Sequence, residues 1–235
     1  MLDRILMILL GPILLAQGKK VRKETPFLPE PPGERIGIAG QGPLLRLLVV
    51  GDSSAAGVGA VHQDLALLGQ IVSRLSQDYT VEYRLEATTG STTRGTVRRL
   101  KKLDPEKFDI AVTSLGANDS TRMISVDKFM EDQERLVNLL KDDFGVKWVV
   151  CSPLPPMHIF PAMPQPLRWV IGRKAMSLNK VLGPWLGSQP GCNFLEREFS
   201  LDVRLMATDG FHPGPEAYEI WGEAMAQRIK ELMEN

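Results

Sequence analysis

Ser53 is the residue of this 235-residue chain whose setting best suits a chemical role. The apolar run Leu47-Leu48-Val49-Val50 ends abruptly in Gly51-Asp52-Ser53, and small residues follow. Such a run is typical of a buried strand, and small residues allow the chain to turn sharply into a helix. Open α/β folds place their chemistry at the carboxyl edge of the sheet. The sequence therefore predicts that Ser53 lies at this edge as a candidate nucleophile.

A serine hydroxyl needs a general base within hydrogen-bonding reach, and the chain contains only the histidines His62, His158 and His212. His62 is expected at the start of the following helix, pointing away from the turn. His158 lies in a proline-rich segment that could line a pocket. His212 follows Asp209 by three residues, close enough for the carboxylate to accept from the imidazole Nδ1–H. Taken alone, this spacing also suits an ordinary loop in which Asp209 caps a turn and His212 is exposed.

Acyl transfer also requires hydrogen-bond donors for the negative charge that develops on the substrate oxygen. The Ser53 backbone N–H, at the start of a helix, is one candidate. Gly90, after the second expected strand, allows the backbone to approach a ligand closely. The Asn118 amide, after the third, could donate a further bond. Each turn is common on its own, but three donors at three consecutive strand ends favour an oxyanion hole.

Together these residues resemble the four sequence blocks of the SGNH, or GDSL-type, hydrolases. The blocks are Gly51-Asp52-Ser53, Gly90, Gly116-Ala117-Asn118-Asp119 and Asp209-Gly210-Phe211-His212. The resemblance spans residues 47–213 and implies a shallow, open active site with no cofactor. It implies Ser53 as nucleophile, His212 as base and Asp209 as its orienter. It also implies an oxyanion hole formed by Ser53, Gly90 and Asn118. Ser54 stands where the name-giving motif has leucine, which weakens a subfamily assignment and leaves the chemistry intact.

Strand-like and helix-like segments alternate along the main part of the chain. The expected strands are 46–50, 79–85, 110–115, 146–151 and 192–195. The expected helices are 63–77, 92–103, 126–140, 172–182 and 215–233. Alternation of this kind predicts a parallel sheet with helices on both faces. With the resemblance, it predicts an α/β, flavodoxin-like three-layer sandwich with a central parallel sheet of about five strands.

Composition indicates one catalytic domain, residues 44–235, preceded by an N-terminal segment and arm, residues 1–43. Residues 24–43 contain five prolines and four glycines, which is typical of a linker or an extended arm. The 28 basic residues balance the 28 acidic ones, so no net field attracts nucleic acid. The two cysteines are too few for a disulfide framework, and a buried thiol is favoured for Cys151. No Cys/His cluster has the spacing of a metal site.

The N-terminal segment is apolar over residues 5–16 and then basic, with Lys19, Lys20, Arg22 and Lys23. Twelve apolar residues fall short of the roughly 20 that span a bilayer. An interfacial anchor, a helix packed on the domain and a signal peptide cleaved after Ala16-Gln17-Gly18 all remain open. Membrane-surface contact through residues 5–23, or packing, is favoured over export. A cytoplasmic or membrane-associated location is therefore expected.

The segment 152–170 carries six prolines and leaves the carboxyl end of an expected strand, on the same edge as Ser53. It could line the substrate site or simply cover the core. Its candidate lining residues are Met157, Ile159, Phe160 and Trp169. These apolar side chains favour an apolar acyl or alcohol group over a sugar.

These observations predict a serine esterase acting on short-chain or lipid-derived acyl esters. A carbohydrate acetyl esterase and an acyltransferase with the same triad are the alternatives. A nucleotide-binding protein is disfavoured because residues 51–59 contain no lysine. The Gly-x-Ser-x-Gly motif of ordinary α/β-hydrolases is absent. A non-catalytic binding module would require a degraded site, whereas every expected catalytic group is present.

Overall fold

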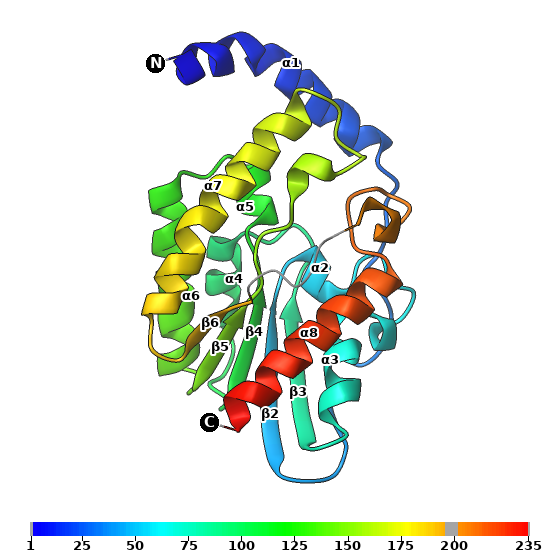
Figure 1. Ribbon diagram of the computed structural model, residues 1–235, viewed down its shortest axis with the longest axis vertical. Helices are drawn as coiled ribbons and strands as arrows, with labels where there is room; N and C mark the ends of the chain where they lie inside the picture. Colours follow the sequence, from blue (N-terminus) through cyan, green and yellow to red (C-terminus); the bar gives the residue numbers. More distant parts are fainter. Residues whose placement is uncertain (1, 196–201, 235) are drawn as a thin grey trace.

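A six-stranded sheet forms the centre of the computed structural model, which describes residues 2–195 and 202–234 (Figure 1). The strands are β1 (Ile36–Ala39), β2 (Leu44–Gly51), β3 (Thr80–Ala87), β4 (Ile110–Ser114), β5 (Trp148–Cys151) and β6 (Cys192–Phe194). Their order across the sheet is β1-β3-β2-β4-β5-β6. All neighbours are parallel except β1, which pairs with β3 in antiparallel fashion. The carboxyl ends of the five parallel strands therefore meet at one edge.

The helices connect these strands and precede and follow the sheet. The α-helices of the described residues are α1 (Leu2–Glu24), α2 (Ser53–Ala56), α3 (Leu67–Leu75), α4 (Thr93–Leu100), α5 (Ala117–Thr121), α6 (Val126–Asp142), α7 (Leu167–Ser188) and α8 (Pro215–Met233). Three short 3₁₀ helices are η1 (Gln63–Leu65), η2 (Met157–Ile159) and η3 (Val203–Leu205).

Two pairs of helices cover the two faces of the sheet and create the three-layer sandwich that the sequence predicts. Side chains alternate between the faces of a strand, so Leu47 and Val49 pack with α3 and α8, whereas Leu48 and Val50 pack with α4 and α6. Both faces of β2 are thus buried, which is why its sequence is almost continuously apolar. A third apolar cluster fills the space between α6, α7 and the segment that carries η2.

The sheet has one strand more than expected, because β1 lies in the arm that was expected to be a linker. Ile36–Ala39 pairs with residues 81–84 of β3, and the Tyr83 ring lies directly against Gly37. The many prolines and glycines of residues 24–43 predicted a linker or an extended arm. The hydrogen bonds that make β1 a strand come instead from β3, more than forty positions later in the sequence. Residues 36–39 therefore belong to the sheet.

Helix α7 is twice as long as the expected helix 172–182, and it continues through Pro184 to Ser188. Leu178, Leu182 and Leu186 are buried at four-residue spacing and form one apolar stripe on either side of the proline. Lys180, whose carbonyl loses its helical donor at Pro184, is exposed to solvent. Burial of the stripe therefore outweighs the local cost of the proline.

Tyr218 links α8 to the turn that follows α2, and its loss should destabilise the fold. Its side chain is fully buried, and its hydroxyl donates to the Val58 carbonyl at 2.7 Å. Tyr218→Phe leaves that buried carbonyl without this donor, so we expect the free energy of unfolding in urea to fall by about 1–3 kcal/mol. Tyr79→Phe, at a half-buried tyrosine, should change it by less than about 0.5 kcal/mol. Equal stabilities of wild type and Tyr218→Phe would contradict this role.

Candidate active site

Ser53 is the first residue of α2 and lies where the central strand β2 ends. Asp52 caps this short helix and accepts a hydrogen bond from the Ser54 N–H at 3.1 Å. Gly51 is required at this turn, because a Cβ there would lie 2.6 Å from the Ser114 carbonyl oxygen of β4. Gly57 then ends the helix with φ of 92°, a conformation that favours glycine. The turn therefore places Ser53 at the carboxyl edge of the sheet, as predicted.

The His212 imidazole connects Ser53 with Asp209. His212 Nε2 lies 2.8 Å from Ser53 Oγ, and His212 Nδ1 lies 2.5 Å from Asp209 Oδ2. The other carboxylate oxygen of Asp209 accepts from the backbone N–H groups of Phe211 and His212, at 2.9 and 3.0 Å. Residues 159 positions apart in the sequence are thus joined in one hydrogen-bonded chain. This is the arrangement in which a histidine activates a serine and a carboxylate orients the histidine.

Asp209 keeps its negative charge although it is buried. Burial alone would raise the pKa of its carboxyl group. The His212 side chain and the backbone N–H groups of His212 and Phe211 outweigh burial and hold this pKa below its usual value. A permanently ionised Asp209 favours the tautomer with the proton on Nδ1 and leaves Nε2 free to accept from Ser53.

A two-sided backbone clamp holds the loop that carries these residues. The Ala207 N–H donates to the His212 carbonyl at 2.8 Å, and the Gly214 N–H donates to the Leu205 carbonyl at 2.7 Å. Gly210, inside the loop, has φ of 63°. The clamp and the Asp209 turn together hold the His212 side chain in one orientation, although this residue lies in a loop.

Asn118 reaches the same region from α5, whose N-cap is Gly116 with φ of 116°. Its Nδ2 donates to Asp52 Oδ2 at 3.2 Å, and the residue lines the cavity next to Ser53. The Asn118 amide has two N–H groups, so one remains for a ligand when the other bonds Asp52. Asp52 therefore contacts both the helix that carries Ser53 and the side chain expected to donate to an oxyanion.

Gly90 follows β3 with φ of 78°, and a carboxylate from the N-terminal arm holds its loop. Glu30 Oε1 accepts from the Thr89 N–H and the Thr89 hydroxyl, at 2.7 and 2.8 Å. The Gly90 carbonyl accepts from Arg122 at 3.1 Å, and Gly90 is outside the set of residues that line the cavity. Sequence reasoning missed Glu30, because a single acidic residue between prolines carries no signal of a partner 59 positions away.

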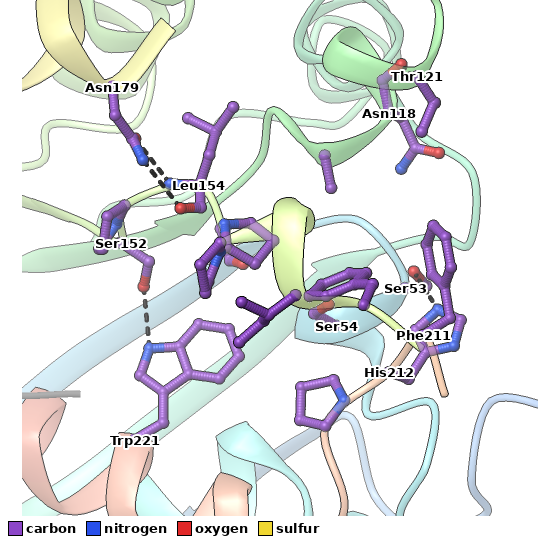
Figure 2. A pocket seen from close by; sticks show the side chains of 18 of the residues that line it. Ser53, Ser54, Asn118, Thr121, Ser152, Leu154, Asn179, Phe211, His212 and Trp221 are labelled. Atoms are coloured by element: carbon purple, nitrogen blue, oxygen red, sulfur yellow. Dashed lines mark hydrogen bonds between the residues drawn. The ribbon is translucent and has the colours of Figure 1, made fainter. Parts of the chain in front are cut away.

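A cavity of about 560 Å³ opens beside Ser53 and His212 (Figure 2). Ile159 and Phe160, two of the four candidate lining residues, contribute to its wall, and so does His158. Met157 and Trp169, the other two candidates, are not among the residues that line it. Met157 occupies the inner side of η2 and is fully buried in the core, whereas Trp169 lies on the outer face of α7 and is 39% exposed.

The sequence analysis missed several residues of the cavity wall. The Trp221 indole of α8 donates to the Ser152 hydroxyl at 3.0 Å, and Figure 2 shows the ring pointing toward that serine. Asn179 of α7 holds the backbone of Leu154 from both sides: it accepts from the Leu154 N–H at 2.8 Å and donates to the Leu154 carbonyl at 2.9 Å. The prolines that follow β5 are thus fixed to two helices, and the segment 152–160 both lines the cavity and covers the core.

Neither a metal site nor a reactive thiol accompanies the cavity within the part of the chain that the structure describes. No group of three or more His, Cys, Asp or Glu residues there could hold a metal ion. Cys151 and Cys192 are free thiols, and burial raises the pKa of Cys151 to about 12. The thiol of Cys151 therefore stays protonated and unreactive.

A comparison with models of protein families assigns the chain to a family. The GDSL-like lipase/acylhydrolase family matches residues 49–220, well over half of the sequence. The protein belongs to this family, as its four sequence blocks predicted. A catalytic triad and an oxyanion hole are typical of these enzymes.

Solved structures show the same fold at low sequence identity. The psychrotrophic esterase EstA from Pseudoalteromonas sp. is 19% identical, with 81% of this chain and 99% of that chain covered and a TM-score of 0.56. Est24, a carbohydrate acetylesterase from Sinorhizobium meliloti, is 19% identical, with 80% and 99% covered and a TM-score of 0.58. An acetyl esterase mutant with acetate ion is 13% identical, with 81% and 98% covered and a TM-score of 0.61. A search of curated proteins found no match.

The buried carboxyl group of Asp52 should make stability depend on pH. Burial raises the pKa of Asp52 from 3.8 to about 6, although the Ser54 N–H, the His212 charge and Asn118 oppose the shift. Because the folded-state pKa lies above the unfolded one, the native state holds the proton between these pH values. The stability of wild type relative to Asp52→Asn should therefore fall by about 2–3 kcal/mol between pH 4 and pH 7, measured by urea unfolding. The exposed control Asp104→Asn should show little change, and a pH-independent difference for Asp52→Asn would contradict the prediction.

Proposed function

We propose that the protein is a serine esterase that hydrolyses carboxylic esters with short-chain or lipid-derived acyl groups. Ser53 is the nucleophile, His212 the general base and Asp209 the residue that orients the base. The single observation that carries this proposal is the position of the His212 ring, within hydrogen-bonding distance of both Ser53 Oγ and Asp209 Oδ2.

Acylation begins when Ser53 Oγ attacks the ester carbonyl carbon and His212 Nε2 takes the hydroxyl proton. Asp209 stays ionised and stabilises the resulting imidazolium. The carbonyl oxygen becomes an oxyanion, which accepts hydrogen bonds from the Ser53 N–H, the Gly90 N–H and the Asn118 amide. The C–O bond to the alcohol then breaks, and His212 returns the proton to the departing oxygen. An acyl group remains on Ser53.

Deacylation repeats these steps with water in place of the serine. His212 Nε2 takes a proton from the water as its oxygen attacks the acyl carbonyl carbon. The bond to Ser53 Oγ breaks, and His212 returns the proton to that oxygen, which releases a carboxylic acid and the free enzyme. A second alcohol in place of water would give acyl transfer by the same route.

The cavity supports an apolar acyl group larger than acetyl. Leu154, Ile159, Phe160 and Leu195 contribute to its wall beside Ser53. A volume of about 560 Å³ lies within the range of 300–1,000 Å³ typical of small-molecule sites. An acyl chain that binds there removes its apolar surface from water, so a longer chain should bind more tightly than an acetyl group.

Replacing either member of the proposed nucleophile–base pair tests the chemistry. Ser53→Ala and His212→Ala should each lower kcat/KM for p-nitrophenyl esters by about 10⁴-fold or more, because the nucleophile and its base act as one unit. The measurement uses a series of acyl chains from acetate upward. The neighbouring Ser54→Ala, whose side chain borders the same cavity, is the matched control and should keep near-wild-type activity.

The same series distinguishes the proposed activity from that of a carbohydrate acetyl esterase. Serine-dependent hydrolysis that improves beyond acetate supports the acyl esterase. Activity restricted to acetate favours a carbohydrate acetyl esterase. Near-wild-type turnover by Ser53→Ala or His212→Ala would contradict the proposed pair.

Asn118→Ala tests the oxyanion donor. Loss of one such donor should lower kcat about 10²–10³-fold with little change in KM, because the bond forms in the transition state. Circular dichroism should show an unchanged fold. Asn179→Ala, which removes an amide at the cavity wall, should instead alter KM and the acyl-chain preference. If Asn118→Ala changed KM and left kcat at the wild-type value, its assignment as the oxyanion donor would be contradicted.

A further inference from the structure

Helix α1 stands apart from the three layers of the domain. Figure 1 shows it across the end of the molecule where α7 begins, with its N-terminal half clear of the other ribbons. Its attachment lies in the second half. Gln17 donates to the Gln165 carbonyl at 2.6 Å and accepts from the Leu167 N–H at 3.1 Å. Leu14 and Val21 pack against the apolar cluster that α7 helps to form. The first half of α1 therefore projects from an anchored second half.

The sequence of α1 is apolar over residues 5–16, which include most of the projecting half and the start of the anchored half. Ile13 and Leu15, near the end of this run, are 48% and 69% exposed. No helix among residues 2–195 and 202–234 is long and apolar enough to cross a membrane. Twelve helical residues measure about 18 Å, roughly half of the 30 Å hydrocarbon core of a bilayer. The length thus suits insertion into a single leaflet.

Four cations follow the apolar run within two turns of helix. Lys19, Lys20, Arg22 and Lys23 are all exposed, and within the described residues their ion pairing is limited to the solvent-exposed contact of Lys20 with Glu24 at 3.9 Å. Cations next to an apolar insertion lie at the level of the lipid headgroups and attract anionic lipid. The charge at this end of α1 is therefore complementary to an anionic membrane surface.

An exposed face of α7 begins two residues after the contact of Leu167 with α1 and extends to the cavity. Trp169, Arg173 and Met176 follow one another at four- and three-residue spacing and so share one face of the helix. The Arg173 guanidinium lies 4.9 Å from the centre of the Trp169 ring. Trp169 and Met176 are 39% and 50% exposed, and Met176 also lines the cavity. Tryptophan and arginine are residues typical of a membrane–water interface.

We propose that α1 and the outer face of α7 bind the surface of an anionic lipid bilayer. The apolar half of α1 inserts into one leaflet, the basic turns contact the headgroups, and Trp169 and Met176 bring the cavity to the membrane. This surface is independent of the proposed chemistry, since none of its residues belongs to the triad or the oxyanion hole.

Vesicle co-sedimentation of the 235-residue chain tests the proposal. The vesicles contain phosphatidylcholine alone or phosphatidylcholine with a minor fraction of phosphatidylserine. Wild type should bind the anionic vesicles preferentially, and less so as salt increases. Replacing Lys19, Lys20, Arg22 and Lys23 together by Gln should weaken this binding at least about tenfold. The matched control replaces four exposed cations of α4 and the turn after it, Arg94, Arg98, Lys101 and Lys102, and should bind as wild type does.

The apolar contribution is tested separately with Ile13→Asp combined with Leu15→Asp, which should also reduce binding at least about tenfold. The α1 charge variant and the Ile13/Leu15 variant should both hydrolyse a soluble p-nitrophenyl ester as wild type does, which would show that they fold. Ser53→Ala should bind vesicles normally even if it proves to have full esterase activity, so failure of the chemistry and failure of the surface are distinguishable.

Three results would overturn the membrane surface. The first is that wild type sediments with neither kind of vesicle, and the second is that the α1 and α4 charge variants bind equally well. A wild-type dimer in light scattering that the Ile13/Leu15 variant converts to a monomer, without vesicle binding, would instead identify a second copy as the occupant.

Discussion

The burial of β2 on both faces and both edges is the constraint on which the rest of the molecule depends. The strand is hydrogen-bonded to β3 on one side and to β4 on the other, and its apolar side chains pack under both helical layers. Because the strand is held on all sides, its carboxyl end has a fixed position. The turn through Asp52 therefore also fixes the position of Ser53 at the edge of the sheet. Strands β3 and β4 run parallel to β2, and for that reason the turns that carry Gly90 and Asn118 emerge at the same edge.

Asp52 holds polar groups of the site in place, but the burial of its carboxyl group lowers the stability of the fold. Its buried carboxyl group resists ionisation, yet its two oxygens accept from the Ser54 N–H and from Asn118 Nδ2. An apolar residue would avoid the desolvation, but it would leave the helix end and the amide without an acceptor. A carboxylate therefore serves here as a brace between two elements, while the neighbouring Asp209 performs the electrostatic task beside His212.

The N-terminal arm contributes more to the catalytic edge than its composition suggests. Strand β1 extends the sheet beyond β3, Glu30 holds the loop that carries Gly90, and Gln17 of α1 holds the first turn of α7. These N-terminal residues thus connect α1 with the loop that carries Gly90 and with the start of α7. A membrane surface on α1, as we propose, would be joined directly to α7, the helix that contributes Met176 and Asn179 to the cavity wall.

The sequence by itself determined the class of fold, the four blocks and the triad candidates. These depend on short-range signals: an apolar run before Gly51, glycine where the backbone turns sharply, and an aspartate three residues from His212. Tertiary structure decided what those signals cannot carry. The antiparallel pairing of β1, the continuation of α7 through Pro184 and the contact of Glu30 with Thr89 all depend on distant partners. Tertiary structure also decided that Met157 and Trp169 lie outside the cavity wall, because residue type does not reveal which face of a loop or helix turns toward the cavity.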